Sequence, residues 1–171
     1  MSADVALAFA NYVYATGDVD YARRIAWPVL RSVAEGIVSR AVRTRRGYEI
    51  HRTVGPREHY EPVDNNAFTN MAAATTLRAS AECATLIGEV PPPSWKEIAG
   101  GLVLPRSRSR GAILNHDGAT LRETQGGVPE AAAGLFPVGY RASAKEELAT
   151  YRYASIEQAP LYVGAPMLSA L

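Results

Sequence analysis

The sequence predicts an all-α fold in which helices are joined by loops that contain short β pieces. Three observations support this prediction: apolar residues recur at helical spacing, residues that cap helices precede these stretches, and glycines follow them. With 171 residues, of which 47% are hydrophobic and 20% are charged, the chain can bury one sizeable core. We therefore expect no more than about one domain.

An αα-hairpin is expected first. Its first helix covers residues 3–16, with an apolar stripe of Val5, Phe9, Tyr12 and Val13. The sequence Thr16-Gly17-Asp18 should end this helix and cap the next, which covers residues 21–41. The second stripe consists of Ile25, Val29, Val33 and Ile37. Pro28 lies inside the second helix and should kink it or mark a late start.

A basic connection over residues 43–54, with a short extended piece at Tyr48-Glu49-Ile50, leads to a long third helix. This helix is expected to begin near Asp64 or Asn65, because either side chain can accept from the free N–H groups of the first turn. Together with Asn66, these residues should divide between capping the helix and orienting the loop, and capping is favoured. Gly88 is expected to end the helix.

Shorter elements are expected in the rest of the chain. Ser94 can cap a short helix, residues 112–114 suggest a short strand, and residues 129–135 suggest another helix. Ser143 and Glu146 have the spacing of a capping box, which should start a further helix.

Composition excludes several kinds of partner. A net charge of +1 gives no reason to expect nucleic acid or an anionic membrane. No apolar run is long enough to span a bilayer, and residues 1–9 lack the basic and apolar regions of a signal peptide. These features favour a cytoplasmic protein, although the natural N-terminus could lie further upstream.

Cofactor and metal sites are not expected. Cys83 is the one cysteine, so an internal disulfide is excluded, and a small core residue is the favoured interpretation. The histidines, His51, His59 and His116, are too far apart in the sequence to form a pair at helical ligand spacing. The alternating arginines and serines of residues 106–110 lack interleaved aromatics, which favours a solvated loop over an RNA or phosphate site.

The most informative segment is residues 55–70, which read Gly-Pro-Arg-Glu-His-Tyr-Glu-Pro-Val-Asp-Asn-Asn-Ala-Phe-Thr-Asn. This segment resembles the acid-catalyst loop of glycoside hydrolase family 65, which contains inverting hydrolases and phosphorylases of α-linked glucosides. In that family the segment reads roughly Gly-Pro-Asp-Glu-Tyr-His-Glu, a spacer, and Asp-Asn-Asn-Ala-Tyr-Thr-Asn. Here Arg57 replaces the aspartate, and His59 and Tyr60 are in the reverse order.

The resemblance implies a six-fold α/α toroid, and it extends over nearly the whole chain, from about Ala6 to Leu171. Residues 1–171 are accordingly expected to be a fragment of one toroid catalytic domain. The N-terminal β-sandwich and the early and late barrel helices of the family would be absent. Such a fragment is expected to be inactive alone and to expose apolar helix faces.

The resemblance makes Glu58 the candidate general acid. Inverting cleavage requires one carboxylic acid to protonate the departing oxygen and a nucleophile on the opposite face of the sugar. The nucleophile is a water held by a second carboxylate or, in a phosphorylase, phosphate itself. Without the motif, Glu58 would be interpreted as an ordinary loop carboxylate. A contact with Arg57 would favour its ionised form and weaken it as an acid.

The second half of the site is expected at Asn115-His116-Asp117-Gly118. Family hydrolases place a glutamate base just before an aromatic-Asp-Gly sequence, and phosphorylases place glutamine there. Asn115 cannot take a proton from water, so Asp117 or Glu123 could supply the base from a shifted position. Asn115 and Asp117 are expected to bind substrate. Gln125 matches the glutamine of a family Lys-Gln-Ala-Asp run that binds the transferred glucose; a polar loop residue is the alternative.

Hydrolysis is favoured over phosphorolysis. Residues 162–167 lack the serines of the family's phosphate-binding loop, and their Gly-Ala-Pro-Met is closer to the Gly-Pro-Ala-Met of the hydrolases. The expected partner is a small α-glucoside, and no metal or organic cofactor is implied. A phosphorylase and a catalytically inactive sugar-binding relative are the alternatives. The substrate linkage and the oligomeric state stay open.

Overall fold

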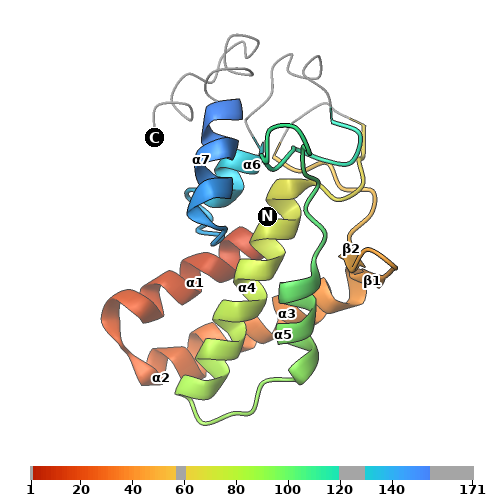
Figure 1. Cartoon of the computed structure of the whole chain (residues 1–171). Helices are drawn as coiled ribbons and strands as arrows, with labels where there is room; N and C mark the ends of the chain where they lie inside the picture. Colours follow the sequence, from red (N-terminus) through yellow and green to blue (C-terminus); the bar gives the residue numbers. More distant parts are fainter. Residues whose placement is uncertain (1, 57–60, 120–129, 155–171) are drawn as a thin grey trace. The chain divides into compact units, whose positions relative to one another are not determined.

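The computed structural model describes residues 2–56, 61–119 and 130–154, most of which are helical (Figure 1). The helices are α1 Ser2–Thr16, α2 Val19–Tyr21, α3 Trp27–Arg40, α4 Ala67–Leu86, α5 Pro93–Gly101, α6 Glu130–Leu135 and α7 Ala144–Arg152, with a π-helical segment η1 at Ala22–Ala26. Two short strands, β1 Val42–Arg43 and β2 Tyr48–Glu49, pair in a two-stranded sheet. The predicted all-α class with short β pieces in loops is confirmed.

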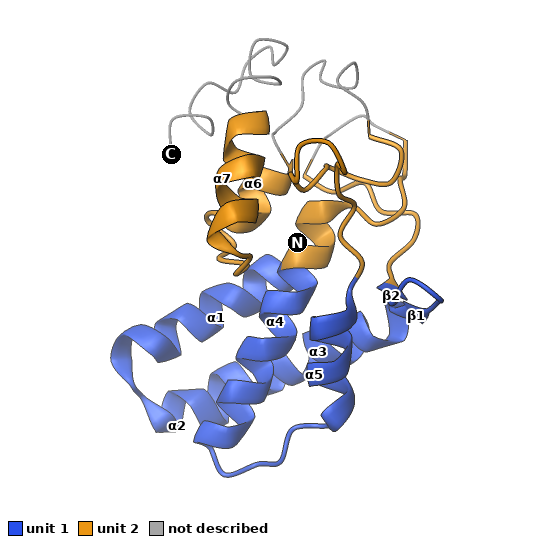
Figure 2. Ribbon diagram, in the orientation of Figure 1, with its two compact units in different colours: residues 1–48, 72–102 blue, residues 49–71, 103–171 orange. Residues whose placement is uncertain are grey.

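The chain divides into two compact units (Figure 2). The first unit consists of Met1–Tyr48 and Ala72–Leu102, and the second of Glu49–Met71 and Val103–Leu171. Helix α4 belongs to both, because its first residues lie in the second unit and the rest in the first. No helix in the described residues is long and apolar enough to cross a membrane.

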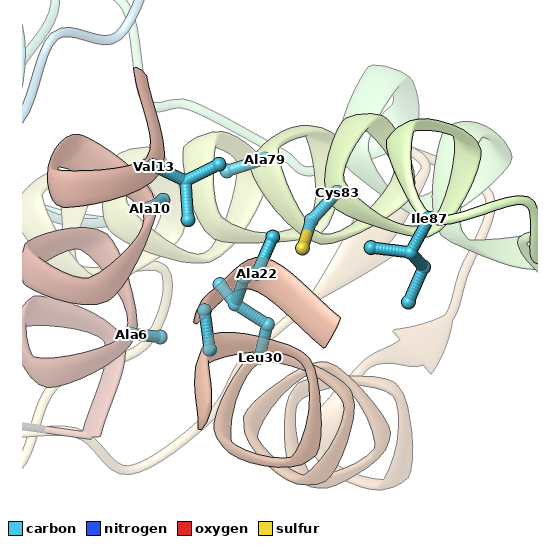
Figure 3. Close-up of a cluster of buried hydrophobic side chains, with 9 residues drawn as sticks. Ala6, Ala10, Val13, Ala22, Leu30, Ala79, Cys83 and Ile87 are labelled. Carbon is cyan, nitrogen blue, oxygen red and sulfur yellow. The ribbon is translucent and has the colours of Figure 1, made fainter. Parts of the chain in front are cut away.

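The core of the first unit is built largely from small side chains (Figure 3). Its buried members are Ala6, Ala10, Val13, Ala22, Ala26, Leu30, Ala79, Cys83 and Ile87. Alanines let the helix backbones approach closely, and the few larger side chains fill the remaining space. Trp27 on α3 and Trp95 on α5 pack with ring centroids 6.0 Å apart.

This core corrects the predicted apolar stripes. Val13 is buried as expected, and Phe9 and Val33 are partly buried against the core. Val5, Tyr12 and Ile25, however, are about half exposed. The prediction gave weight to bulky side chains, whereas closely packed helices bury the neighbouring alanines instead. Cys83 is buried in this core as predicted, and its burial raises the pKa of the thiol.

Several helix ends in the first unit agree with the sequence. Gly17 has a φ of 65°, its N–H donates to the Val13 carbonyl over 2.8 Å, and α1 stops before it. Asp18 then caps α2 by accepting from the Tyr21 N–H over 2.8 Å. Pro28 lies in the first turn of α3, but the helical backbone continues into α3 from η1, so Pro28 marks a change from π-helix to α-helix and the prediction of a late start is wrong. Pro28 has no N–H for a helical bond, which explains why the regular helix restarts there.

The start of α5 differs from the prediction. Ser94 was expected as its cap, but the helix begins at Pro93 with Pro92 as the capping position and no side-chain cap. Proline suits the first helical position because its φ is already fixed and its missing N–H would have no intrahelical partner there.

The core of the second unit contains Ala67, Met71, Leu104, Ile113 and Ala131. At the predicted strand of residues 112–114, the structure has an isolated antiparallel bridge between Ile113 and Arg106. The Ile113 N–H also donates to Thr150 Oγ1 on α7 over 2.9 Å, which ties this segment to the helix.

The capping box predicted for α7 is half formed. Ser143 Oγ accepts from the Glu146 N–H over 3.3 Å, as expected at a helix N-terminus. The Glu146 carboxylate does not complete the box, because it pairs with Arg106 instead. Glu147 Oε1 accepts from the N–H of Ala142, one residue before the cap, over 3.2 Å.

Candidate functional site

The candidate acid loop is closed at its base by a pair of backbone hydrogen bonds. The Thr53 N–H donates to the Val63 carbonyl over 2.9 Å, and the Val63 N–H donates to the Thr53 carbonyl over 2.8 Å. This antiparallel bridge sets the two stems of the loop side by side. The candidate acid Glu58 itself lies outside the described residues, so the structure gives the stem of the loop and leaves the acid's role a prediction.

The loop leads directly into the cap of α4. Asn66 Oδ1 accepts from the Thr69 N–H over 3.0 Å and from Thr69 Oγ1 over 3.1 Å. Asn66 is therefore the capping residue, which corrects the expectation of a start at Asp64 or Asn65. Gly55 has a φ of 70°, and a Cβ built on it would lie only 2.5 Å from Asn66 Nδ2. Glycine is thus required where the loop backbone passes the cap.

Asp64 orients the loops instead of capping the helix. Its Oδ1 accepts from the Arg52 N–H over 3.0 Å, and its backbone carbonyl accepts from the Asp117 N–H over 3.1 Å. The expected division between capping and loop orientation therefore holds, with Asn66 in the first role and Asp64 in the second.

Asn65 lies at the centre of a buried polar cluster that we call the Asn65 cluster, formed by Glu49, Asn65, Asn70 and Asp117. The Asn65 side chain is fully buried, and its backbone has a φ of 51°, in the left-handed region. Asn65 Nδ2 donates to Asp117 Oδ2 over 2.8 Å and to Glu49 Oε2 over 3.1 Å. Asn65 Oδ1 accepts from the Ile50 N–H and from Asn70 Nδ2, each over 3.3 Å.

The loop that carries Asn115 is anchored to two helices. The Asn115 carbonyl accepts from the Ala67 N–H at the start of α4 over 2.7 Å, and Asn115 Oδ1 accepts from the Ala131 N–H of α6 over 3.2 Å. The side-chain oxygen of Asn115 is thus engaged by the protein. His116 is also buried, and its Nδ1 lies 2.8 Å from the Asp117 carbonyl.

The structure therefore brings together part of the predicted site. Asn115 and Asp117 lie beside the stem of the acid loop, through the contacts of Asp64, Asn65 and Ala67. Gln125, with its neighbours Glu123 and Thr124, lies outside the described residues.

Sequence reasoning missed Glu49, which is only 7% exposed and belongs to the Asn65 cluster. Its one signal was the short extended piece at Tyr48-Glu49-Ile50, close before the acid-loop motif. His51 Nε2 lies 3.2 Å from Glu49 Oε2, and His51 Nδ1 lies 3.9 Å from Asp64 Oδ2. Within the described ranges, no three His, Cys, Asp or Glu side chains are grouped so that they could hold a metal ion.

Comparison with known proteins identifies the family. The glycosyl hydrolase family 65 central catalytic domain matches residues 1–125. The chain belongs to glycoside hydrolase family 65. The resemblance stated from the acid-loop motif is thereby confirmed.

Similar proteins within family 65 include both hydrolases and phosphorylases. The chain is 36% identical to a kojibiose hydrolase of Flavobacterium johnsoniae over 121 residues, which are 70% of this chain and 18% of that protein. A protein-glucosylgalactosylhydroxylysine glucosidase of Danio rerio is 36% identical over 61% of this chain and 16% of its own length. A 1,2-alpha-glucosylglycerol phosphorylase of Bacillus selenitireducens is 31% identical over 69% of this chain and 18% of its own length.

The fold agrees with this membership. A solved structure of a putative kojibiose phosphorylase from human microbiome superposes with a TM-score of 0.68 and 15% identity, covering 94% of this chain and 27% of that one. The predicted fold class, part of an α/α toroid, is thus confirmed. The chain spans less than a fifth of the length of the three relatives described above.

Proposed function

We propose that this chain contributes part of the catalytic site of an inverting α-glucoside hydrolase. Glu58 is the general acid, an activated water is the nucleophile, and a small α-glucoside is the substrate. We further propose that residues 1–171 are a fragment of one toroid catalytic domain.

One observation supports this proposal most directly. The stem of the acid loop and the loop that carries Asp117 are hydrogen-bonded to each other through Asn65 and Asp64. Inverting cleavage needs groups on both sides of the sugar, so two polar loops held beside each other suit that chemistry. Asp117 and Asn115 are proposed to bind substrate from the second loop, together with Gln125.

Phosphorolysis is the second candidate. A phosphorylase is among the similar proteins at 31% identity, and the solved structure of similar fold is described as a putative phosphorylase. The hydrolase is preferred because residues 162–167 lack the serines expected of a phosphate-binding loop. A sugar-binding relative without activity is the third candidate, since Arg57 and Asn115 depart from the family pattern.

The test compares the complete gene product with its Glu58→Gln variant on a panel of α-linked glucosyl disaccharides, with and without inorganic phosphate. Glutamine keeps the shape of the side chain but cannot donate the acidic proton. The proposal expects phosphate-independent release of glucose, lost in Glu58→Gln while sugar binding is retained. Release that requires phosphate would establish the phosphorylase, and binding without turnover in both versions would establish the inactive relative.

A further inference from the structure

Two carboxylates converge on one amide nitrogen in the second unit. Glu49 Oε2 and Asp117 Oδ2 both accept from Asn65 Nδ2, at 3.1 Å and 2.8 Å. An asparagine amide has two hydrogens, so Nδ2 can serve both acceptors at once. Neighbouring carboxylates disfavour each other's charged form, and a shared donor offsets that repulsion.

The orientation of the Asn65 amide is fixed by the groups on its other side. Asn65 Oδ1 accepts from the Ile50 N–H, which can only donate, and also from Asn70 Nδ2. A flipped amide would place Nδ2 against the Ile50 N–H and break these bonds, so the nitrogen must face the two acids. Asn70 is held in turn, because its Nδ2 also donates to the Val103 carbonyl over 2.7 Å.

The two carboxylates differ in how far solvent reaches them. Glu49 is 7% exposed, whereas Asp117 is partly exposed. A dissolved ligand can therefore approach Asp117, while Glu49 stays inside the protein. The backbone of Asp117 is also held, because its N–H donates to the Asp64 carbonyl. Both the backbone and one carboxylate oxygen of Asp117 are thus fixed before any ligand arrives.

We propose that Asn65 is a positioning residue that aims the Asp117 carboxylate at a hydroxyl group of the bound glucoside. The inference rests on the proposed function, because it assigns a sugar to Asp117. Asn65 touches no substrate and acts through Asp117, with Glu49 as the buried second acceptor that keeps the amide in place. Preorganisation of this kind raises affinity by removing the cost of ordering the binding group.

A double-mutant cycle on the complete gene product tests the inference. The variants are Asn65→Gly, Asp117→Ala and their combination, and the readouts are kcat and KM on the α-glucoside that the wild type turns over best. Glycine keeps the left-handed backbone at position 65 and removes the side chain with its amide. Thermal unfolding and far-UV circular dichroism establish that each variant is folded.

Each single variant is expected to lower kcat/KM by about ten- to hundredfold, the range for a lost hydrogen bond to a charged group. KM should rise by more than kcat falls, because a hydroxyl contact acts in the ground state as well as in the transition state. If Asn65 acts through Asp117, the double variant will have a kcat/KM no lower than that of Asp117→Ala alone.

The matched control is Asn66→Asp, which removes the same amide nitrogen one residue later but keeps the oxygen that caps α4. Its effect should combine additively with that of Asp117→Ala. If the effects of Asn65→Gly and Asp117→Ala on kcat/KM also add, the positioning role is overturned. The proposed function would stand in that case, because the wild type is active. A wild type that neither binds nor cleaves any glucoside of the panel would instead refute the proposed function, and the inference with it.

Discussion

The two units of the molecule bury different kinds of side chain. The buried polar or charged side chains described in the second unit are Glu49, Asn65, Asn66, Asn70, Asn115, His116, Glu130 and Thr150. Those described in the first unit are Thr76 and Ser80, and Ser80 Oγ donates to the Thr76 carbonyl of its own helix and to the Leu30 carbonyl of α3. Among the described residues, buried polar side chains are therefore few in the first unit and numerous in the second, where they stand beside an apolar core.

The two kinds of buried side chain have different effects: apolar ones stabilise the fold, and hydrogen-bonded polar ones also fix the direction of side chains. Apolar packing is not directional, so a core of alanines and leucine fixes how closely helices approach without fixing a polar group. A satisfied buried polar network costs more to form but specifies the direction of each side chain. The candidate site residues that the structure describes, Asn115 and Asp117, lie in the unit where buried polar side chains are numerous, and a binding site requires side chains of fixed direction.

The largest change in the free energy of unfolding is expected for a substitution in the core of the first unit. Leu30 is fully buried on α3, and Leu30→Ala should lower the free energy of unfolding by about 2–5 kcal/mol because it leaves a cavity. The measurement is urea unfolding followed by circular dichroism. Ile25 is the matched control, since it lies in the preceding segment but is 47% exposed. Ile25→Ala should change the free energy by no more than about 0.5 kcal/mol.

If Ile25→Ala costs as much as Leu30→Ala, the stripe predicted from the sequence would be the true core and the alanine core would be wrong. The comparison of the two variants thus tests which side of the second helix of the hairpin is buried.

A smaller effect is expected at the start of α4. Asn66→Ala removes the oxygen that accepts from the Thr69 N–H, and loss of such a cap costs about 0.5–2 kcal/mol of stability. Asn66→Ser retains an acceptor and should recover most of the loss. Thermal unfolding of the three proteins measures both changes. An equal loss in the alanine and serine variants would show that Asn66 contributes through something other than its cap.

The sequence was most informative where structure is decided locally. Gly17 and Asp18 end and begin helices through contacts within four residues, so their roles could be predicted from type and spacing. The buried faces of the helices could not be predicted in this way, because helical spacing alone does not tell which apolar side chains a neighbouring helix will cover. Close packing selected Ala22 and Ala26 over the bulkier Ile25.

The site was predictable only in part, for a related reason. The acid-loop motif and Asp117 were found from a contiguous pattern. The bonds that join them are not local: Asn65 lies 16 residues from Glu49 and 52 residues from Asp117 in the chain. No local periodicity brings such residues together, so Glu49 and the central role of Asn65 appear only in the folded structure.

The smallest effect is expected at an exposed ion pair in the first unit. Glu97 Oε1 accepts from the Tyr48 hydroxyl over 2.8 Å and from Arg43 Nη1 over 2.6 Å. The Tyr48 hydrogen bond, followed by the Arg43 contacts, lowers the pKa of Glu97 below its ordinary value. A carboxylate with a lowered pKa stabilises the fold above its unfolded pKa, and this contribution disappears as the pH falls through the folded pKa.

Glu97→Gln should therefore weaken the fold slightly at neutral pH and make no difference in strong acid. Because Glu97 and Arg43 are exposed, solvent and salt screen their attraction, and the difference should shrink further at about 1 M salt. Unfolding curves of both proteins across acid and neutral pH measure it. A difference that persists unchanged in acid would mean that the Glu97 charge is not what stabilises this surface.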